Sequence, residues 1–119
     1  MYEIFTHGRF EVAPENEQAF VAAWSEFAAW ASERDGAGTL RLVRDVRNVG
    51  QFVSFGQWDD AEAVRAWKSS PEFKERIGRV VRQATHFEPT ELVTLVRVTD
   101  GTAEALSPPA GIEPIHAPT

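Results

Sequence analysis

The sequence has 119 residues, of which 43% are hydrophobic and 25% charged, and this balance is typical of one globular domain with a single core. Its net charge of -6 disfavours binding to the phosphate backbone of nucleic acids, and the absence of cysteine excludes disulfides and thiol catalysis. No apolar run approaches the roughly 20 residues that span a bilayer, and no secretory signal is visible. We therefore expect a cytoplasmic protein that contacts neither membranes nor nucleic acid.

The first third of the chain predicts a strand followed by a long helix. Residues 2–13 alternate between a mostly apolar face and a mixed face, as strand residues do. Pro14 ends this strand, and Asn16 is a candidate N-cap for a helix that runs to about Arg34. Aromatic and alanine residues recur in this helix at steps of three and four, which indicates one apolar face. They are Phe20, Ala23, Trp24, Phe27, Trp30 and Ala31.

The middle of the chain predicts a hairpin and then a divided helix. Residues 39–47 and 51–58 both alternate, and the short turn between them is typical of a hairpin. Asp59 or Asp60 can cap the next helix, because an aspartate oxygen accepts hydrogen bonds from free amides at a helix start. Ser70, followed by a proline, restarts the helix, which we expect to end near residue 84.

The end of the chain predicts one more strand and a tail. Residues 85–98 form the strand candidate, with a bend at residues 88–90, where a proline interrupts the pattern. Residues 99–119 carry four of the seven prolines, so we expect an extended tail without a core of its own. The domain then covers residues 1–98.

The order strand, helix, strand, strand, split helix, strand predicts an α+β fold of the ferredoxin-like βαββαβ type. Its four-stranded antiparallel sheet would carry helices on one face only. The uncovered face would be too apolar for water, so we expect a homodimer that packs sheet to sheet. The apolar residues expected on that face are Val43, Val53, Phe55, Val93 and Leu95.

The stretch FVSFGQWDDAEAVRAWKSSPEFKERI is the most distinctive part of the chain. A strand ends in Trp58, an acidic cap leads into a short helix with Trp67, and Ser70 is followed three residues later by Phe73. In this pattern, and over about residues 2–98, the chain resembles the antibiotic biosynthesis monooxygenase family of the dimeric α+β barrel superfamily. The resemblance implies a homodimer whose two sheets form a dimeric α/β barrel, and one pocket per protomer between helices and sheet. It also implies two activities, oxygenation of aromatic phenols with O2 alone or degradation of haem.

Haem degradation is disfavoured. The resemblance to haem-degrading relatives would require an asparagine on the first strand, the strand-ending tryptophan and an iron-binding histidine in the last helix. These positions correspond to Gly8, Trp58 and Ile77, so two of the three groups are lost. Isoleucine cannot bind iron. We expect no metal and no cofactor.

Oxygenation without a cofactor needs an electron-rich substrate in an apolar pocket, a group that takes its proton and a donor that stabilises the resulting anion. Trp58 and Arg44 are the candidate catalytic residues, the first from the resemblance and the second from its place in the strand pattern. The expected substrate is a small aromatic, polyketide-like molecule. The candidate substrate-binding residues are Thr6, Trp24, Phe27, Ser54, Trp67, Phe73 and Ile77.

Each candidate also has a structural interpretation. Aromatic residues at helical spacing usually form core, and Trp58 can be core or pocket wall. Arg44 can pair with a carboxylate, extend to the rim or bind an anion. His7 faces away from Trp58 and is an interface histidine or a base. The competing hypothesis is therefore a non-catalytic dimeric binding or structural protein whose pocket is filled by its own tryptophans.

Overall fold

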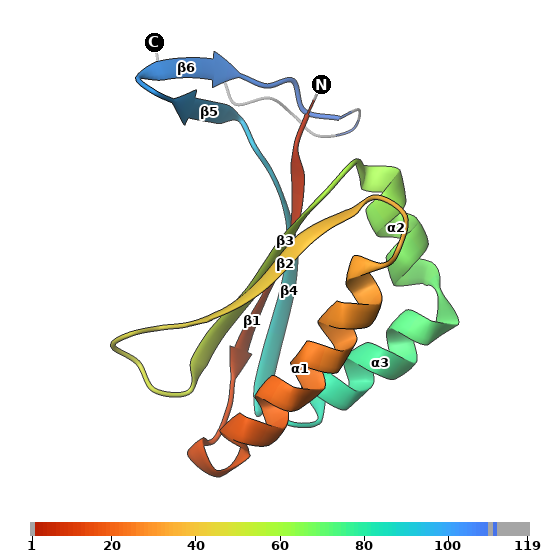
Figure 1. Ribbon diagram of the computed structural model, residues 1–119, viewed down its shortest axis with the longest axis vertical. Coiled ribbons are helices and arrows are strands. Elements are labelled where there is room, and N and C mark those ends of the chain that lie inside the picture. The colour runs from red at the N-terminus through yellow and green to blue at the C-terminus, as the bar shows by residue number, and fades with distance from the viewer. Residues whose placement is uncertain (1, 110, 112–119) are drawn as a thin grey trace.

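The computed structural model describes residues 2–109 and 111, and it confirms the α+β ferredoxin-like fold. One antiparallel sheet carries all the helices on one of its faces (Figure 1). The elements are β1 (Ile4–Glu11), a 3-10 turn (Pro14–Asn16), α1 (Glu17–Ser32), β2 (Ala37–Arg44), β3 (Gln51–Trp58), α2 (Ala61–Ser69), α3 (Pro71–Val81), β4 (His86–Val93), β5 (Val96–Thr99) and β6 (Thr102–Ala105).

The four-stranded sheet has the order β2-β3-β1-β4, with β1 and β3 in the centre. The β2–β3 pair is the hairpin that the sequence predicts, and all neighbouring strands are antiparallel. Phe10 pairs with Phe52 of β3 on one side and with Phe87 of β4 on the other. This register places three aromatic rings in one row beneath α1 and α3, and the Phe10 and Phe87 rings stack at 4.6 Å.

The core lies between the sheet and the helices, as the alternation in β1 predicts. Ile4 and Phe10 of β1 are buried, whereas Arg9 and Glu11 on the opposite face are exposed. On the helical side, Phe20 is fully buried and packs between Phe10 and Phe52, with ring centroids about 5 Å apart. Burial of such apolar surface is the main favourable term in folding.

The caps of the three helices differ from one another. Asn16 stands at the start of α1 but makes no hydrogen bond with its side chain, so the expected cap is absent there. Asp60, and not Asp59, caps α2 by accepting a hydrogen bond from the Ala63 amide at 2.8 Å. Ser70 joins α2 to α3, because its hydroxyl donates to the Trp67 carbonyl at 2.8 Å and accepts from the Phe73 amide at 3.1 Å.

The last strand differs from its expected form. β4 continues through the predicted bend, with Pro89 opposite Gly8 of β1. Because β4 is at the sheet edge, a proline without an N–H is tolerated there. The strand ends at Val93, which pairs with Ile4 and packs against the core, so the expectation that Val93 faces outward is wrong. Leu95 lies beyond the strand, between β4 and β5.

A second hairpin stands where the sequence predicts a strand end and an extended tail. β5 and β6 pair through a turn in which Asp100 and Gly101 both have positive φ, the geometry that suits a two-residue hairpin turn. The hairpin lies beyond the end of the main sheet (Figure 1). Arg97 holds it to the start of β1, because its guanidinium donates to Glu3 at 2.8 Å and to Glu104 at 2.6 Å. Residues 110 and 112–119 of the predicted tail lie outside the described residues.

The outer face of the sheet carries three of the apolar side chains that the sequence predicts there, on the strands β2 and β3. Val53 and Phe55 of β3 are half-buried there, and Val43 of β2 is 42% exposed. Leu92 of β4, at 47% exposed, takes the place expected for Val93. In the described part of the chain, no helix is long and apolar enough to cross a membrane.

Replacing Ser70 by alanine should lower the free energy of unfolding by about 1 kcal/mol, because the first turn of α3 loses its cap. Ser69→Ala is the matched control, since Ser69 is exposed and makes no comparable bond in the described structure. Urea unfolding followed by tryptophan fluorescence measures both changes. Equal effects of the two substitutions would contradict the capping role.

Candidate functional site

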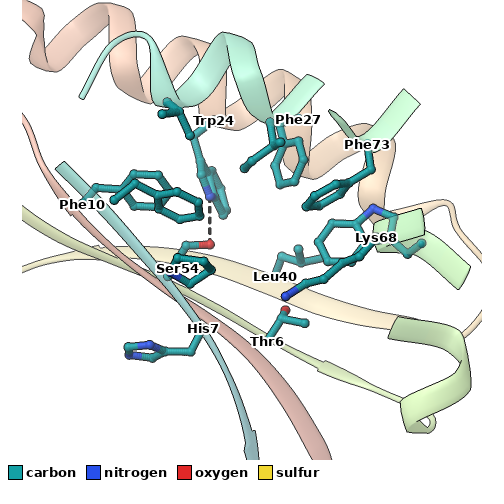
Figure 2. Close-up of a pocket in the computed structure, with 15 residues that line it drawn as sticks. Thr6, His7, Phe10, Trp24, Phe27, Leu40, Ser54, Lys68 and Phe73 are labelled. Carbon is teal, nitrogen blue, oxygen red and sulfur yellow. Dashed lines mark hydrogen bonds between the residues drawn. The ribbon is translucent and has the colours of Figure 1, made fainter. Parts of the chain in front are cut away.

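A cavity of about 230 Å³ lies between the sheet and the helices (Figure 2). Residues from β1, α1, β2, β3, α2, α3 and β4 surround it, so nearly the whole fold contributes to its wall. The lining residues are Thr6, His7, Gly8, Phe10, Trp24, Phe27, Leu40, Ser54, Trp67, Lys68, Phe73, Ile77, Val81, Phe87 and Pro89.

The helical side of the cavity is aromatic. Trp24 and Phe27 of α1 and Phe73 of α3 point inward from above the sheet (Figure 2). Phe27 contacts both Trp67 and Phe73, with ring centroids 5.7 and 5.9 Å apart. These pairs are tilted or edge-to-face, which are favourable geometries for aromatic rings. The cavity therefore offers faces and edges of rings to a planar apolar ligand.

The sheet side supplies two hydroxyl groups, Thr6 of β1 and Ser54 of β3. Each accepts a hydrogen bond from a tryptophan: Trp24 Nε1 donates to Ser54 Oγ at 2.9 Å, and Trp58 Nε1 donates to Thr6 Oγ1 at 3.1 Å. An indole N–H can only donate, so each hydroxyl retains its own proton as a donor. Neither proton is donated to another group in the described residues. The two hydroxyls can therefore donate to an oxygen of a bound molecule.

Trp58 does not line this cavity, contrary to the sequence-based expectation. Its indole is 1% exposed and stacks on Trp67 at 4.5 Å, so Trp67 takes the position nearer the cavity. Trp58 acts on the site through its hydrogen bond to Thr6. The Nε1–H of Trp67 is buried without a hydrogen-bond partner in the described structure, an arrangement that typically costs about 1–3 kcal/mol.

Arg44 also lies away from the cavity. It is on the helical face of β2, opposite Phe52, as its place in the pattern predicts. However, it stands at the end of the strand, where its guanidinium donates to Glu17 of α1 at 3.1 Å. Of the three alternatives open for Arg44, the structure shows the pairing with a carboxylate.

Lys68 is a cavity residue that the sequence interpretation missed. It belongs to α2, is 28% exposed in its side chain and extends along the sheet side of the cavity toward Thr6 (Figure 2). Its Nζ lies 3.7 Å from Glu91 Oε2 of β4. The spacing in the sequence could have predicted this position. Lys68 follows the fully buried Val64 by four residues, so the two side chains lie on the same face of α2.

The remaining predicted residues can also be located. Thr6, Trp24, Phe27, Ser54, Trp67, Phe73 and Ile77 all border the cavity. Gly8 borders it too, and a Cβ there would meet the Phe87 ring at 3.0 Å. Haem-degrading relatives would have an asparagine at the position of Gly8 and an iron-binding histidine at that of Ile77. Both positions border the cavity here, and neither carries a polar side chain.

The described histidines lie outside the cavity interior. The His7 side chain points away from the other labelled residues, and its Nδ1 lies 3.0 Å from Thr90 Oγ1 (Figure 2). His86 forms a hydrogen bond with Glu88 that lowers the pKa of that carboxyl group. His116 is outside the described residues. Within residues 2–109 and 111, no group of three His, Cys, Asp or Glu side chains could hold a metal ion.

Several solved structures share this fold. A cofactor-independent oxygenase from Streptomyces nogalater, SnoaB, superposes with a TM-score of 0.72 at 21% identity, over 84% of this chain and 98% of that one. Rv0793 from Mycobacterium tuberculosis gives a TM-score of 0.69 at 19% identity, covering 82% and 99% of the two chains. A conserved protein from Methanosarcina mazei gives 0.68 at 17% identity, covering 79% and 92%.

Comparison of the sequence with protein-family models identifies the family of this chain. No curated protein matches the chain significantly. The model of the antibiotic biosynthesis monooxygenase family matches residues 4–78, from β1 to the interior of α3, and so includes most of the cavity wall. The chain therefore belongs to the antibiotic biosynthesis monooxygenase family.

Proposed function

We propose that the protein is a cofactor-independent monooxygenase that oxidises a small aromatic phenol with O2 inside the cavity. The observation that carries this proposal is the pairing of aromatic walls with two free hydroxyl donors, Thr6 and Ser54. Membership of the family and the similarity in fold to SnoaB, which is a cofactor-independent oxygenase, support the same reaction class.

The chemistry requires O2, hydrogen-bond donors and a substrate that has lost its phenol proton, because the anion supplies the electrons. The phenolate passes two electrons to O2, one at a time because ground-state O2 has two unpaired electrons, and a C–O bond forms at a ring carbon, which gives a peroxide. Proton transfer and loss of water then leave a quinone, with one oxygen atom in the product and the other in water. Thr6 and Ser54 would stabilise the negative charge on the phenolate and peroxide oxygens by hydrogen bonding, as donors do in other anion-stabilising sites.

The size of the cavity limits the substrate. Its volume of about 230 Å³ is below the roughly 300–1,000 Å³ that is typical of sites for drug-sized ligands. A molecule of one or a few fused rings therefore fits better than a large polycyclic compound. Its flat faces would contact the rings of Trp24, Phe27 and Phe73.

The competing hypothesis, a dimer whose pocket is filled by its own tryptophans, finds less support. Trp24 and Trp67 stand at the wall of the cavity and leave its interior open, and the polar groups Thr6 and Ser54 face the space. A protein that binds aromatic molecules without oxidising them has the same geometry. Turnover separates that function from the proposed one.

Ser54→Ala should reduce kcat/KM by about 10- to 100-fold for a substrate that the protein oxidises, such as a hydroquinone or anthrone, which reacts as its phenolic tautomer. The reason is that a hydrogen bond to a charged group contributes about 1.5–3 kcal/mol. Ser25→Ala is the matched control, because Ser25 is an exposed residue of α1 that bonds only to the Val21 carbonyl. The measurement is O2 consumption by protein treated with chelator. The absence of any O2-dependent turnover across a panel of phenols would refute the proposed function.

We also propose that a second copy of the chain covers the outer face of the sheet. Val53 and Phe55 lie on the central strand β3, and Val43 and Leu92 are exposed apolar residues of the two edge strands, β2 and β4. Burial of such a face against an identical one about a two-fold axis would remove this apolar surface from water.

Phe55→Lys should convert the dimer to a monomer, because it would place two like charges in the apolar centre of the interface. Val21→Lys is the control: Val21 is 40% exposed but lies on α1, away from the sheet face. Sedimentation velocity gives the oligomeric state of each variant. A monomeric wild-type protein, or a Phe55→Lys variant that remains dimeric, would contradict this interface.

A further inference from the structure

We propose that Lys68, which pairs with Glu91 when no ligand is bound, recognises an anionic oxygen, so that the cavity selects acidic aromatic molecules over neutral ones of the same shape. This inference rests on the proposed function only in treating the cavity as the substrate site. It adds the chemical class of the substrate, an aromatic ring bearing a phenolate or carboxylate. It also names Lys68 as the residue that binds this negative charge.

The first observation is the isolation of the Lys68 charge. Among the described residues that line the cavity, Lys68 is the only one with a full positive charge, since the others are apolar, hydroxyl-bearing or a histidine that points away. Trp67 and Phe73, which also line the cavity, add apolar rings to the same wall. A charge beside apolar walls is screened less than one in open solvent, so it attracts an anion more strongly.

The second observation is that the ammonium group of Lys68 donates no hydrogen bond within the described structure. An ammonium group has three N–H donors, and a charge-assisted hydrogen bond to a carboxylate is about 2.7–2.9 Å long. The distance of 3.7 Å to Glu91 exceeds this range, so the two groups form a loose ion pair. The described structure contains no hydrogen bond from Lys68 to another protein group, and its donors are therefore available to a ligand.

The third observation is the position of Glu91. It lies on the edge strand β4 directly opposite Thr6, and its side chain is 50% exposed. It can therefore balance the Lys68 charge in the empty cavity and move into solvent when a ligand brings its own negative charge. Glu91 acts in this way as a competitor for Lys68, and an anionic oxygen would replace it near the Thr6 hydroxyl.

The three groups define how an acidic substrate would lie. Its ring occupies the aromatic part of the cavity, and its charged oxygen points toward the side where α2 faces β4. There, Lys68 supplies the positive charge and Thr6, oriented by the Trp58 indole, supplies a hydroxyl proton. A neutral ring of the same size makes the apolar contacts but leaves Lys68 paired with Glu91.

Calorimetric binding of 2-naphthoate and of neutral 2-naphthalenemethanol at pH 7.5 tests this proposal. The wild-type protein should bind naphthoate at least about tenfold more tightly, since a charged hydrogen bond is worth more than 1.4 kcal/mol. Lys68→Met should remove this preference without weakening the binding of naphthalenemethanol, and Lys68→Arg should restore most of it. Glu91→Gln should strengthen naphthoate binding, because it removes the competitor.

Lys74→Met is the matched control, because Lys74 is an exposed residue of α3 and its loss changes the net charge of the protein by the same amount. It should leave both affinities unchanged. Equal affinity of the wild type for the two ligands, or a naphthoate preference that survives in Lys68→Met, would overturn the proposal. Weaker naphthoate binding in Glu91→Gln would overturn the competitor role. Because these measurements need no turnover, they remain informative if the oxygenase reaction itself is refuted.

Discussion

The site depends on the need of buried indole N–H groups for acceptors. A buried tryptophan without a hydrogen bond loses the solvation of its N–H, so two of the indoles are placed against hydroxyls of the sheet. The Trp24 bond to Ser54 ties α1 to β3, and the Trp58 bond to Thr6 ties β3 to β1. The same two bonds occupy acceptor sites on both hydroxyls and leave their protons for the cavity. The hydroxyl groups that tie these elements together are thus also polar groups of the cavity wall.

The aromatic layer also explains why the cavity stays open. Trp58 stacks on Trp67, and Trp67 contacts Phe73 edge-on with ring centroids 4.7 Å apart. Gly8 has no side chain on the floor of the cavity, and the rings of Phe87 and Phe10 pack closely against it there. In addition, the Phe10–Phe87 stack closes the end of the cavity near the start of β4. The resulting space is bounded by rings, and its polar groups lie on the sheet side.

The two faces of the sheet have separate roles in this arrangement. The inner face supplies the hydroxyls and the floor of the cavity, and the outer face carries an apolar surface centred on Phe55. Because neighbouring strand residues point to opposite faces, the side chains of Thr6 and Ser54 face the cavity, whereas the side chains of His7 and Phe55 point to the outer face. The Arg97 bridge between the second hairpin and Glu3 defines a third region, and none of the described residues of β5 and β6 lines the cavity.

Sequence patterns alone predict the order of the elements from β1 to β4, the antiparallel sheet with one helical face, the family and most of the aromatic wall, but they miss the β5–β6 hairpin. Hydrophobic periodicity and helix caps are local signals, and they place residues such as Phe27, Ser54 and Ser70 without knowledge of distant contacts. Which polar side chains reach the cavity depends instead on the three-dimensional packing of the helices on the sheet. Arg44 has the correct face but stands at the strand end beside Glu17, and Trp58 is screened by Trp67. Lys68 of α2 lines the cavity within ion-pair distance of Glu91 of β4, and the face of Val93 depends on its pairing with Ile4. These outcomes follow from strand register and from the position of helices over the sheet, which long-range packing sets and periodicity alone does not specify.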